Sequence, residues 1–121
     1  MLTIDRSILR FIVLPIASMM AFVSTANAET IRTKSFLIDI NRQCEEGNVS
    51  CNRVIYVGTE LKTGRSIRLT GRTLNNSHSY RFLGYEFRNG QYRYIISDDN
   101  SLLVYKGDRL ILQEKGTMLS N

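Results

Sequence analysis

The sequence predicts an all-β protein, a small antiparallel meander curled into a barrel or a strongly twisted sheet, which follows a cleaved signal peptide. Three observations support this prediction. The first 28 residues have the layout of a secretory leader. From Ile31 onward, apolar and polar residues alternate with the period of a β-strand and show no helical period. Turn-forming residues interrupt the alternation about every 8–12 residues, a spacing typical of all-β domains.

Residues 1–28 are predicted to be a signal peptide. Arg6 and Arg10 lie in the positive first region, an apolar core spans residues 11–23, and Ala26-x-Ala28 is the small-residue pattern of a cleavage site. The alternative is a transmembrane anchor, which needs about 20 apolar residues, whereas this run has 13. We therefore expect residues 29–121 to form a single β-domain that is periplasmic or secreted and does not span a membrane after cleavage.

The expected mature chain is small and moderately basic. Its 93 residues are enough for one domain and too few for two. Without the leader, 14 Lys and Arg residues stand against 10 Asp and Glu residues, which gives a net charge of +4. This balance favours anionic partners such as lipopolysaccharide, peptidoglycan or an acidic protein, and plain solubility is the alternative. We expect no nucleic-acid partner, because the chain is exported and has no dense run of Lys and Arg.

Cys44 and Cys51 are the two cysteines of the chain. In an oxidising compartment a pair this close predicts a disulfide, and Gly47 and Asn48 supply the turn that the loop requires. A zinc site would need four ligands, and His78 is the sole histidine. A thioredoxin-like redox pair would have the spacing C-x-x-C, whereas this pair is C-x6-C.

Alternation predicts seven strands, over residues 31–40, 53–61, 66–73, 80–87, 92–97, 102–106 and 109–114. Short turns separate most of them: Gly64 lies in the first, Asn89-Gly90 in the second and Gly107-Asp108 in the third. In the strand over 66–73, Ile67 and Leu69 are expected to face the interior. The tail, residues 116–121, is expected to be loose.

No combination of residues predicts catalysis. His78 lies in a polar Asn/Ser loop and is interpreted as a solvated side chain. Asp98 and Asp99 fit a turn, because the twelve-residue spacing with a distal Glu that a Ca²⁺ loop uses is missing. The sequence also has no Gly-rich phosphate loop and no His cluster with metal-ligand spacing. We therefore expect no enzyme activity, no metal and no cofactor.

Aromatic and basic residues gather in one stretch of the chain. Tyr and Arg are the residue types that most often anchor protein interfaces. The alternative is that several of the aromatic residues form the core of a small barrel that has no Trp, and the sequence leaves this choice open. The candidate binding surface consists of Tyr80, Tyr85, Arg88, Tyr92, Arg93, Tyr94 and Tyr105.

Residues 105–112, Tyr-Lys-Gly-Asp-Arg-Leu-Ile-Leu, resemble the late strands of the periplasmic inhibitors of c-type lysozyme, which carry Lys-Gly-Asp and Asp-Arg-Ile/Leu elements. The resemblance implies a small antiparallel barrel and an inhibitory function. The Ser-Gly-x-x-Tyr type element of that family's inhibitory loop does not occur in this chain, and the family's cysteine pair spans a longer stretch. No inhibitory residue is therefore carried over.

These features predict an exported, non-catalytic binding protein of the bacterial envelope. The leading hypothesis is that it binds another protein, in the way that a hydrolase inhibitor or a toxin-immunity protein does. The alternative is a module that binds an anionic glycan or lipid, such as lipopolysaccharide or peptidoglycan.

Overall fold

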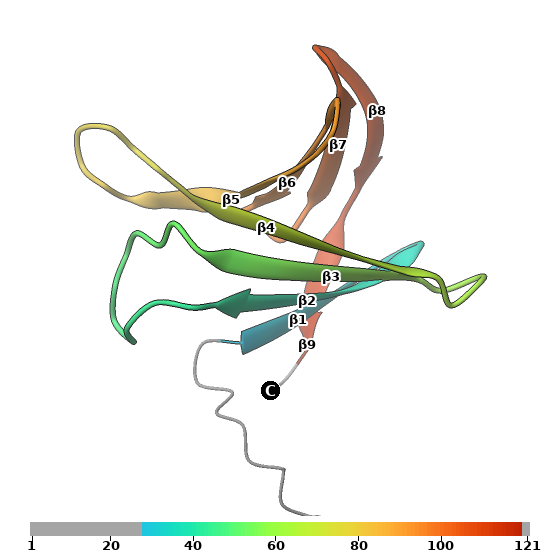
Figure 1. The fold of residues 1–121 in the computed structure, drawn as a ribbon, viewed down its shortest axis with the longest axis horizontal. Coiled ribbons are helices and arrows are strands. Elements are labelled where there is room, and N and C mark those ends of the chain that lie inside the picture. The colour runs from blue at the N-terminus through green and yellow to red at the C-terminus, as the bar shows by residue number, and fades with distance from the viewer. Residues whose placement is uncertain (1–27, 120–121) are drawn as a thin grey trace, which may run out of the picture.

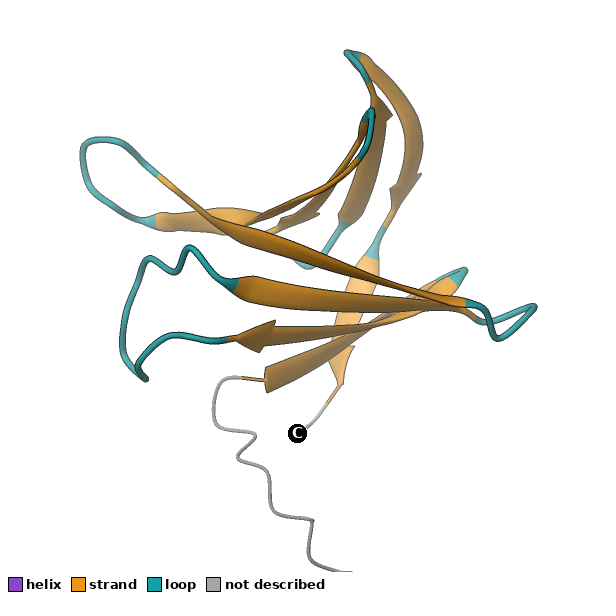
Figure 2. Ribbon diagram, in the orientation of Figure 1, coloured by secondary structure: helices purple, strands orange, loops and turns teal. Residues whose placement is uncertain are grey.

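The structure, a computed structural model, describes residues 28–119. Residues 1–27 of the predicted leader lie outside the described residues, and its last residue, Ala28, is the first described residue. Within residues 28–119 the chain forms strands and loops and no helix (Figures 1 and 2). The strands are β1 (Ala28–Thr33), β2 (Phe36–Arg42), β3 (Val54–Glu60), β4 (Ser66–Asn75), β5 (Phe82–Asn89), β6 (Tyr92–Ser97), β7 (Leu102–Lys106), β8 (Arg109–Glu114) and β9 (Gly116–Leu119).

All nine strands belong to one antiparallel sheet with the order β8-β7-β6-β5-β4-β3-β2-β1-β9. Only Lys115 separates β8 from β9, so these two strands act as one bent strand. Its first half pairs with β7 and its second half pairs with β1. The sheet therefore curls into a nearly closed barrel (Figure 1), with eight strands around it when β8 and β9 are counted as one. This confirms the predicted fold class.

Short hairpins connect most of the strands, as the turn residues predict. Gly90 and Gly107 have φ of +63° and +61°, the left-handed conformation that two-residue hairpin turns require and that glycine adopts without strain. The strand predicted from Tyr80 begins two residues later, at Phe82. Tyr80 itself has a φ of +62°, which is incompatible with an extended strand and places this residue in the loop.

The prediction of one strand over residues 31–40 is wrong, because the chain reverses at Lys34 and Ser35 between β1 and β2. This turn contains no Gly, Pro or Asn. It is held by side chains instead: the Phe36 amide donates to Thr33 Oγ1 at 3.0 Å, and Ser35 donates from its amide and its hydroxyl to the Glu114 carboxylate at 3.0 and 2.7 Å. Glu114 is 79 residues away in the sequence, so local turn signals do not reveal the turn.

The prediction of a loose tail is wrong for residues 116–119, which form β9 and pair with β1. Gly116 allows this strand to pass close to the β6–β7 turn. A Cβ atom at this position would lie 2.2 Å from the carbonyl oxygen of Asn100 and 2.7 Å from Ile31 Cγ2. This segment forms a strand because its backbone pairs with the free edge of β1. The side chains of residues 116–119 do not indicate this pairing.

The core fills the inside of the barrel with side chains that alternate along each strand. On β3 the buried face carries Val54 and Tyr56. Ile67, expected to be buried, is on the same face as Gly58 across the β3–β4 pair but is 38% exposed, because the inner face opens to solvent at this point. The fully buried apolar side chains are Ile31, Ile38, Ile40, Cys51, Val54, Tyr56, Tyr85, Phe87, Ile96 and Leu102.

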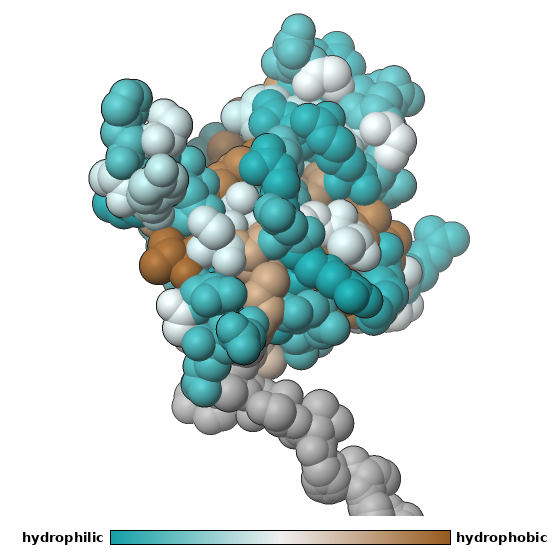
Figure 3. All heavy atoms as spheres, turned by 60° about the vertical axis from the view of Figure 1, so that its left-hand side comes forward, coloured by the Kyte–Doolittle hydropathy of each residue, from teal (hydrophilic) through white to brown (hydrophobic). Residues whose placement is uncertain are grey.

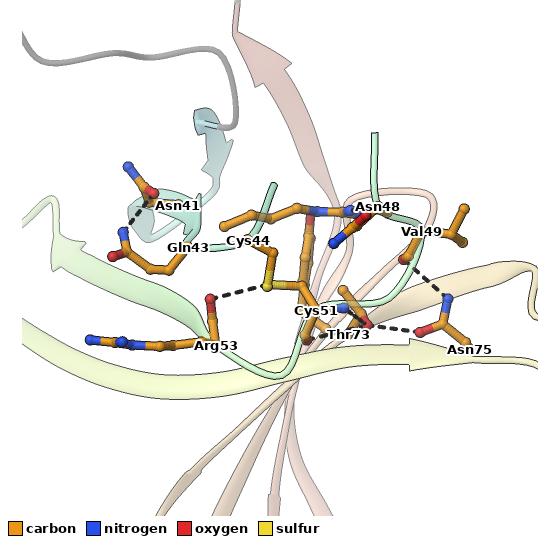
Figure 4. Close-up of a disulfide and its surroundings, with 11 residues drawn as sticks. Asn41, Gln43, Cys44, Asn48, Val49, Cys51, Arg53, Thr73 and Asn75 are labelled. Carbon is orange, nitrogen blue, oxygen red and sulfur yellow. Dashed lines mark hydrogen bonds between the residues drawn. A yellow bond between two sulfur atoms is a disulfide. The ribbon is translucent and has the colours of Figure 1, made fainter. Parts of the chain in front are cut away.

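Cys44 and Cys51 form the predicted disulfide, with a Cα–Cα distance of 5.9 Å. The loop that it closes is tied to β4 (Figure 4). The Cys51 amide donates to Thr73 Oγ1 at 2.9 Å, and the Asn75 amide group donates to the carbonyl of Val49 at 3.3 Å. The disulfide loop is therefore packed onto the barrel as part of its structure.

Figure 3 shows one face of the molecule, on which hydrophilic residues predominate and hydrophobic residues appear as small patches between them. None of the residues 28–119 belongs to a helix long and apolar enough to cross a membrane.

Candidate functional site

The outer face of β4–β6 carries an unusual group of charges, which we call the guanidinium cluster: Arg72, Arg88 and Arg93 around Glu86. One Glu86 carboxylate oxygen lies 2.9 Å from Arg72, and the other lies 3.5 Å from Arg88 and 3.4 Å from Arg93. The Glu86 side chain is 8% exposed, whereas the three arginine side chains are 54%, 70% and 34% exposed. One buried carboxylate thus faces three partly exposed cations.

Strand register creates this cluster. Arg72 of β4 is the partner of Glu86 on β5, and Arg88 of β5 is the partner of Arg93 on β6. Since Tyr85 is buried in the interior, its neighbour Glu86 points to the outside of the barrel. Two like charges opposite one another are unfavourable, and the central carboxylate offsets this repulsion. The cluster still carries a net charge of +2.

The surface beside the guanidinium cluster forms a groove. A groove of about 280 Å³ runs over it, lined by Asn52, Thr70 and Gly71 together with Arg72, Glu86 and Arg88. On the other side, the Arg93 guanidinium lies 4.7 Å from the ring centroid of Tyr105, so its position is fixed by a cation–π contact. The exposed N–H groups of the three arginines are hydrogen-bond donors in a fixed fork, a geometry suited to carboxylate or phosphate oxygens.

The structure divides the seven predicted surface residues among four places. Arg88, Arg93 and Tyr105 come together on the outer face. Tyr85 lies in the core at 2% exposure, so it cannot belong to a binding surface in this state. Tyr92 and Tyr94 are half-buried on the inner face, and Tyr80 stands alone in the β4–β5 loop at 67% exposure.

Tyr85 has a structural role at the end of the barrel next to the disulfide loop. Its hydroxyl accepts a hydrogen bond from Arg42 Nε at 3.1 Å and donates to the Glu29 carboxylate at 3.2 Å. Arg42 also donates to the carbonyl of Asn48 at 2.8 Å and lies over the Phe82 ring. Burial raises the pKa of the Tyr85 phenol, and the charge of Arg42 opposes this shift. These contacts connect the barrel interior to the disulfide loop.

The polar residues with possible chemistry, His78, Asp98 and Asp99, lie in exposed loops. No group of three or more His, Cys, Asp or Glu side chains in residues 28–119 could hold a metal ion. His78 is exposed, and its ring contacts the Ser77 hydroxyl at 3.2 Å. Asp98 and Asp99 are exposed in the β6–β7 turn, and Asp98 pairs with Arg81 at 3.6 Å.

Arg72 and Glu86 belong to the cluster but were absent from the predicted surface. The sequence contained a signal for Glu86: the Asn89-Gly90 pair predicts a tight hairpin. In the structure the two-residue turn is Gly90-Gln91, and its register puts Glu86, Arg88 and Arg93 on one face. Arg72 lies across a longer loop, and a register shift at residues 74–75 intervenes. The sequence therefore does not predict that Arg72 lies beside Glu86.

Comparison of the chain with protein-family models, with curated proteins and with solved structures finds no match in any of the three. The resemblance of residues 105–112 to lysozyme inhibitors therefore stays a prediction. In the structure these residues form the end of β7, a turn and the start of β8.

Proposed function

We propose that the protein is an exported, non-catalytic binding protein of the bacterial envelope that recognises an acidic surface of another protein, as a hydrolase inhibitor or a toxin-immunity protein does. The observation that carries the proposal is the guanidinium cluster. Arg72, Arg88 and Arg93 share the single carboxylate of Glu86, and each retains exposed surface. The remaining charge of +2 is available to an anionic partner.

The guanidinium groups of the cluster are held in place as well as charged, and both properties strengthen binding. Glu86 and Tyr105 restrain the guanidinium groups before a partner arrives, which lowers the entropy lost when they are immobilised. Arg and Tyr anchors of this kind often contribute most of an interface's energy. Cell-wall glycosidases carry a pair of carboxylates at their catalytic centre, and such an acidic site is complementary to the cluster.

One further observation supports export. The Cys44–Cys51 disulfide is formed, and structural disulfides persist in oxidising compartments such as the periplasm. Periplasmic location, secretion and the signal peptide are part of the proposal.

A second candidate function is binding of an anionic glycan or lipid, such as lipopolysaccharide or peptidoglycan. It is favoured by the same guanidinium groups, because a fork of N–H donors also suits phosphate oxygens. The two candidates differ in salt dependence and in stoichiometry. A charged envelope surface should release the protein steeply as salt rises, whereas a packed protein interface should retain a one-to-one complex.

The test compares Arg88→Ala with Lys62→Ala. Both variants remove one exposed positive charge, but Lys62 lies in the β3–β4 turn and makes no ion pair within residues 28–119. Partners are captured from envelope extract, purified and titrated by calorimetry, and inhibition of a c-type lysozyme is assayed in parallel. We expect R88A to weaken the complex about tenfold and K62A to leave it unchanged.

The proposal is contradicted if no partner binds and no hydrolase is inhibited at micromolar protein, or if R88A binds as the wild type does. Sedimentation with lipopolysaccharide vesicles and with purified peptidoglycan separates the second candidate. Binding there that is lost in R88A and at high salt, with no protein partner, would favour the glycan or lipid module.

A further inference from the structure

The inner face of the barrel is hollow near the β3–β4 hairpin. A cavity of about 510 Å³ opens there, and we call it the mouth cavity. This volume is within the range of small-molecule sites, about 300–1,000 Å³, and exceeds the roughly 30 Å³ share of one water molecule. Eight-stranded barrels have an interior of about the size that holds one small ligand. The residues that line the cavity are Phe36, Tyr56, Gly58, Glu60, Arg65, Ser66, Ile67 and Tyr94.

Three of the eight residues that line the mouth cavity are aromatic, and the apolar walls come from four strands. Phe36 lies on β2, Tyr56 on β3, Ile67 on β4 and Tyr94 on β6. The rings of Tyr56 and Tyr94 meet edge to face, with centroids 5.6 Å apart. Ile67 is 38% exposed, so part of the apolar wall of the cavity is not covered by other side chains. Flat apolar walls of this kind favour an aromatic ligand.

The Tyr56 hydroxyl is a buried polar group without a hydrogen-bond partner in residues 28–119. The whole residue is 1% exposed. Its ring turns along β3 toward the cavity and lies over Gly58: a Cβ atom on Gly58 would be 2.6 Å from the Tyr56 hydroxyl oxygen. Buried hydroxyls are nearly always paired, and this one can donate to an acceptor that enters the cavity it lines.

The rim of the cavity supplies an available positive charge. Arg65 is exposed, and its guanidinium makes no ion pair within the described residues 28–119. The neighbouring carboxylate of Glu60 instead accepts a hydrogen bond from the Thr63 hydroxyl at 2.6 Å. A ligand that enters the cavity with its polar end outward would meet Arg65.

We propose that the mouth cavity binds a small organic anion with a flat aromatic body. The ring lies against Phe36, Tyr94 and Ile67, and the anionic group pairs with Arg65. A hydrogen-bond acceptor on the ligand receives the proton of the Tyr56 hydroxyl. This site is on the inner face, separate from the guanidinium cluster on the outer face, so either can exist without the other.

The test titrates the full mature chain with 2-naphthoate and, separately, with its neutral counterpart 2-naphthamide. Amide NMR maps the site, and calorimetry gives the affinity. We expect saturable binding of naphthoate with a Kd below about 1 mM, with the largest shifts at Phe36, Gly58 and Ile67. Naphthamide should bind at least threefold more weakly, because it cannot form the ion pair.

Three variants test the assigned contacts. Tyr56→Phe removes only the hydroxyl and should weaken naphthoate binding about threefold to tenfold. Arg65→Ala should have a similar effect that disappears at 1 M NaCl. Lys62→Ala, the matched control in the same turn, should bind as the wild type does. Thermal melts of all three variants show whether they are folded, and the map on the wild-type protein does not depend on them.

The proposal is overturned if naphthoate shows no saturable binding at 5 mM. Shifts confined to the outer face, around Arg88 and Arg93, would assign the anion to the guanidinium cluster and also refute it. Equal affinity for naphthamide, or unchanged affinity in both Y56F and R65A, would refute the two polar contacts. None of these outcomes affects the proposed protein-binding function, which R88A tests.

Discussion

Replacement of Glu86 by Gln is the most direct perturbation of the guanidinium cluster. The substitution keeps the shape of the side chain and one acceptor oxygen, but it removes the charge that Arg72, Arg88 and Arg93 share at 2.9, 3.5 and 3.4 Å. The three guanidinium groups then repel one another with no central anion. We expect the domain to lose stability and its outer face to gain positive charge.

The magnitude follows from exposure and distance. The arginine side chains are 54%, 70% and 34% exposed, so each pair contributes only about 0.5 kcal/mol after screening by solvent. Loss of three pairs costs about 1.5 kcal/mol. Repulsion between Arg88 and Arg93, which are directly opposite across β5 and β6, is present in the wild type as well and does not add to the difference. The expected loss is about 1.5 kcal/mol, or a fall in Tm of about 8 °C for a domain of this size.

Urea denaturation of the wild type, E86Q and the control Asp108→Asn measures this loss. Asp108 is exposed in the β7–β8 turn, so D108N makes the same charge change at a cost below about 0.5 kcal/mol. The double variant E86Q/R88A should recover about 0.5 kcal/mol, because it removes one of the repelling charges. In 1 M NaCl the gap between E86Q and the wild type should shrink.

An E86Q variant no less stable than D108N would contradict the predicted loss. Further destabilisation of E86Q by the added Arg88→Ala replacement would also contradict it, since that would mean that Arg88 contributes packing and that repulsion is negligible. A loss that persists unchanged in high salt would indicate that Glu86 acts through its shape.

Three further predictions concern the framework of the domain. Reduction of the Cys44–Cys51 disulfide, which closes a loop with a sequence separation of seven, should lower the free energy of unfolding by about 2.5 kcal/mol on the chain-entropy model, and an unchanged urea midpoint would contradict this. Gly116→Ala should cost at least about 2 kcal/mol, because its Cβ would overlap the Asn100 carbonyl; a wild-type melting curve would show that β9 is not tightly packed. Burial raises the pKa of the Glu114 carboxyl, but hydrogen bonds from Ser35 and Thr33 outweigh burial and hold that pKa below its ordinary value. The ionised Glu114 therefore stabilises the fold above the ordinary carboxyl pKa, and this stabilisation is lost as the pH falls through the lower pKa of the folded state. Glu114→Gln should make stability fall less steeply on acidification. Parallel pH profiles of stability for the variant and the wild type would refute this.

The elements predicted correctly are those with a local cause. Alternation of apolar and polar residues specifies a strand through the two-residue period of its side chains. Gly90 and Gly107 supply the positive φ that a tight hairpin turn needs. The disulfide also follows from proximity in the sequence, because Cys44 and Cys51 are joined through a short loop.

The elements that were wrongly predicted depend on distant partners. The turn at Ser35 is stabilised by Glu114, and β9 is a strand because β1 offers it a row of backbone hydrogen-bonding groups. The exposure of Ile67 depends on where the curled sheet stays open. None of these causes is visible within a short window of sequence.

The sequence by itself determined that this chain is an antiparallel β-domain with a disulfide, because side-chain period, turn glycines and close cysteines act over a few residues. Only the tertiary structure decided which aromatic and basic residues are accessible. It buried Tyr85, joined Arg72 and Glu86 to Arg88 and Arg93, and left a cavity beside Tyr56. The physical reason is that accessibility and charge pairing depend on strand register and sheet closure, which are set by contacts between residues far apart in the chain.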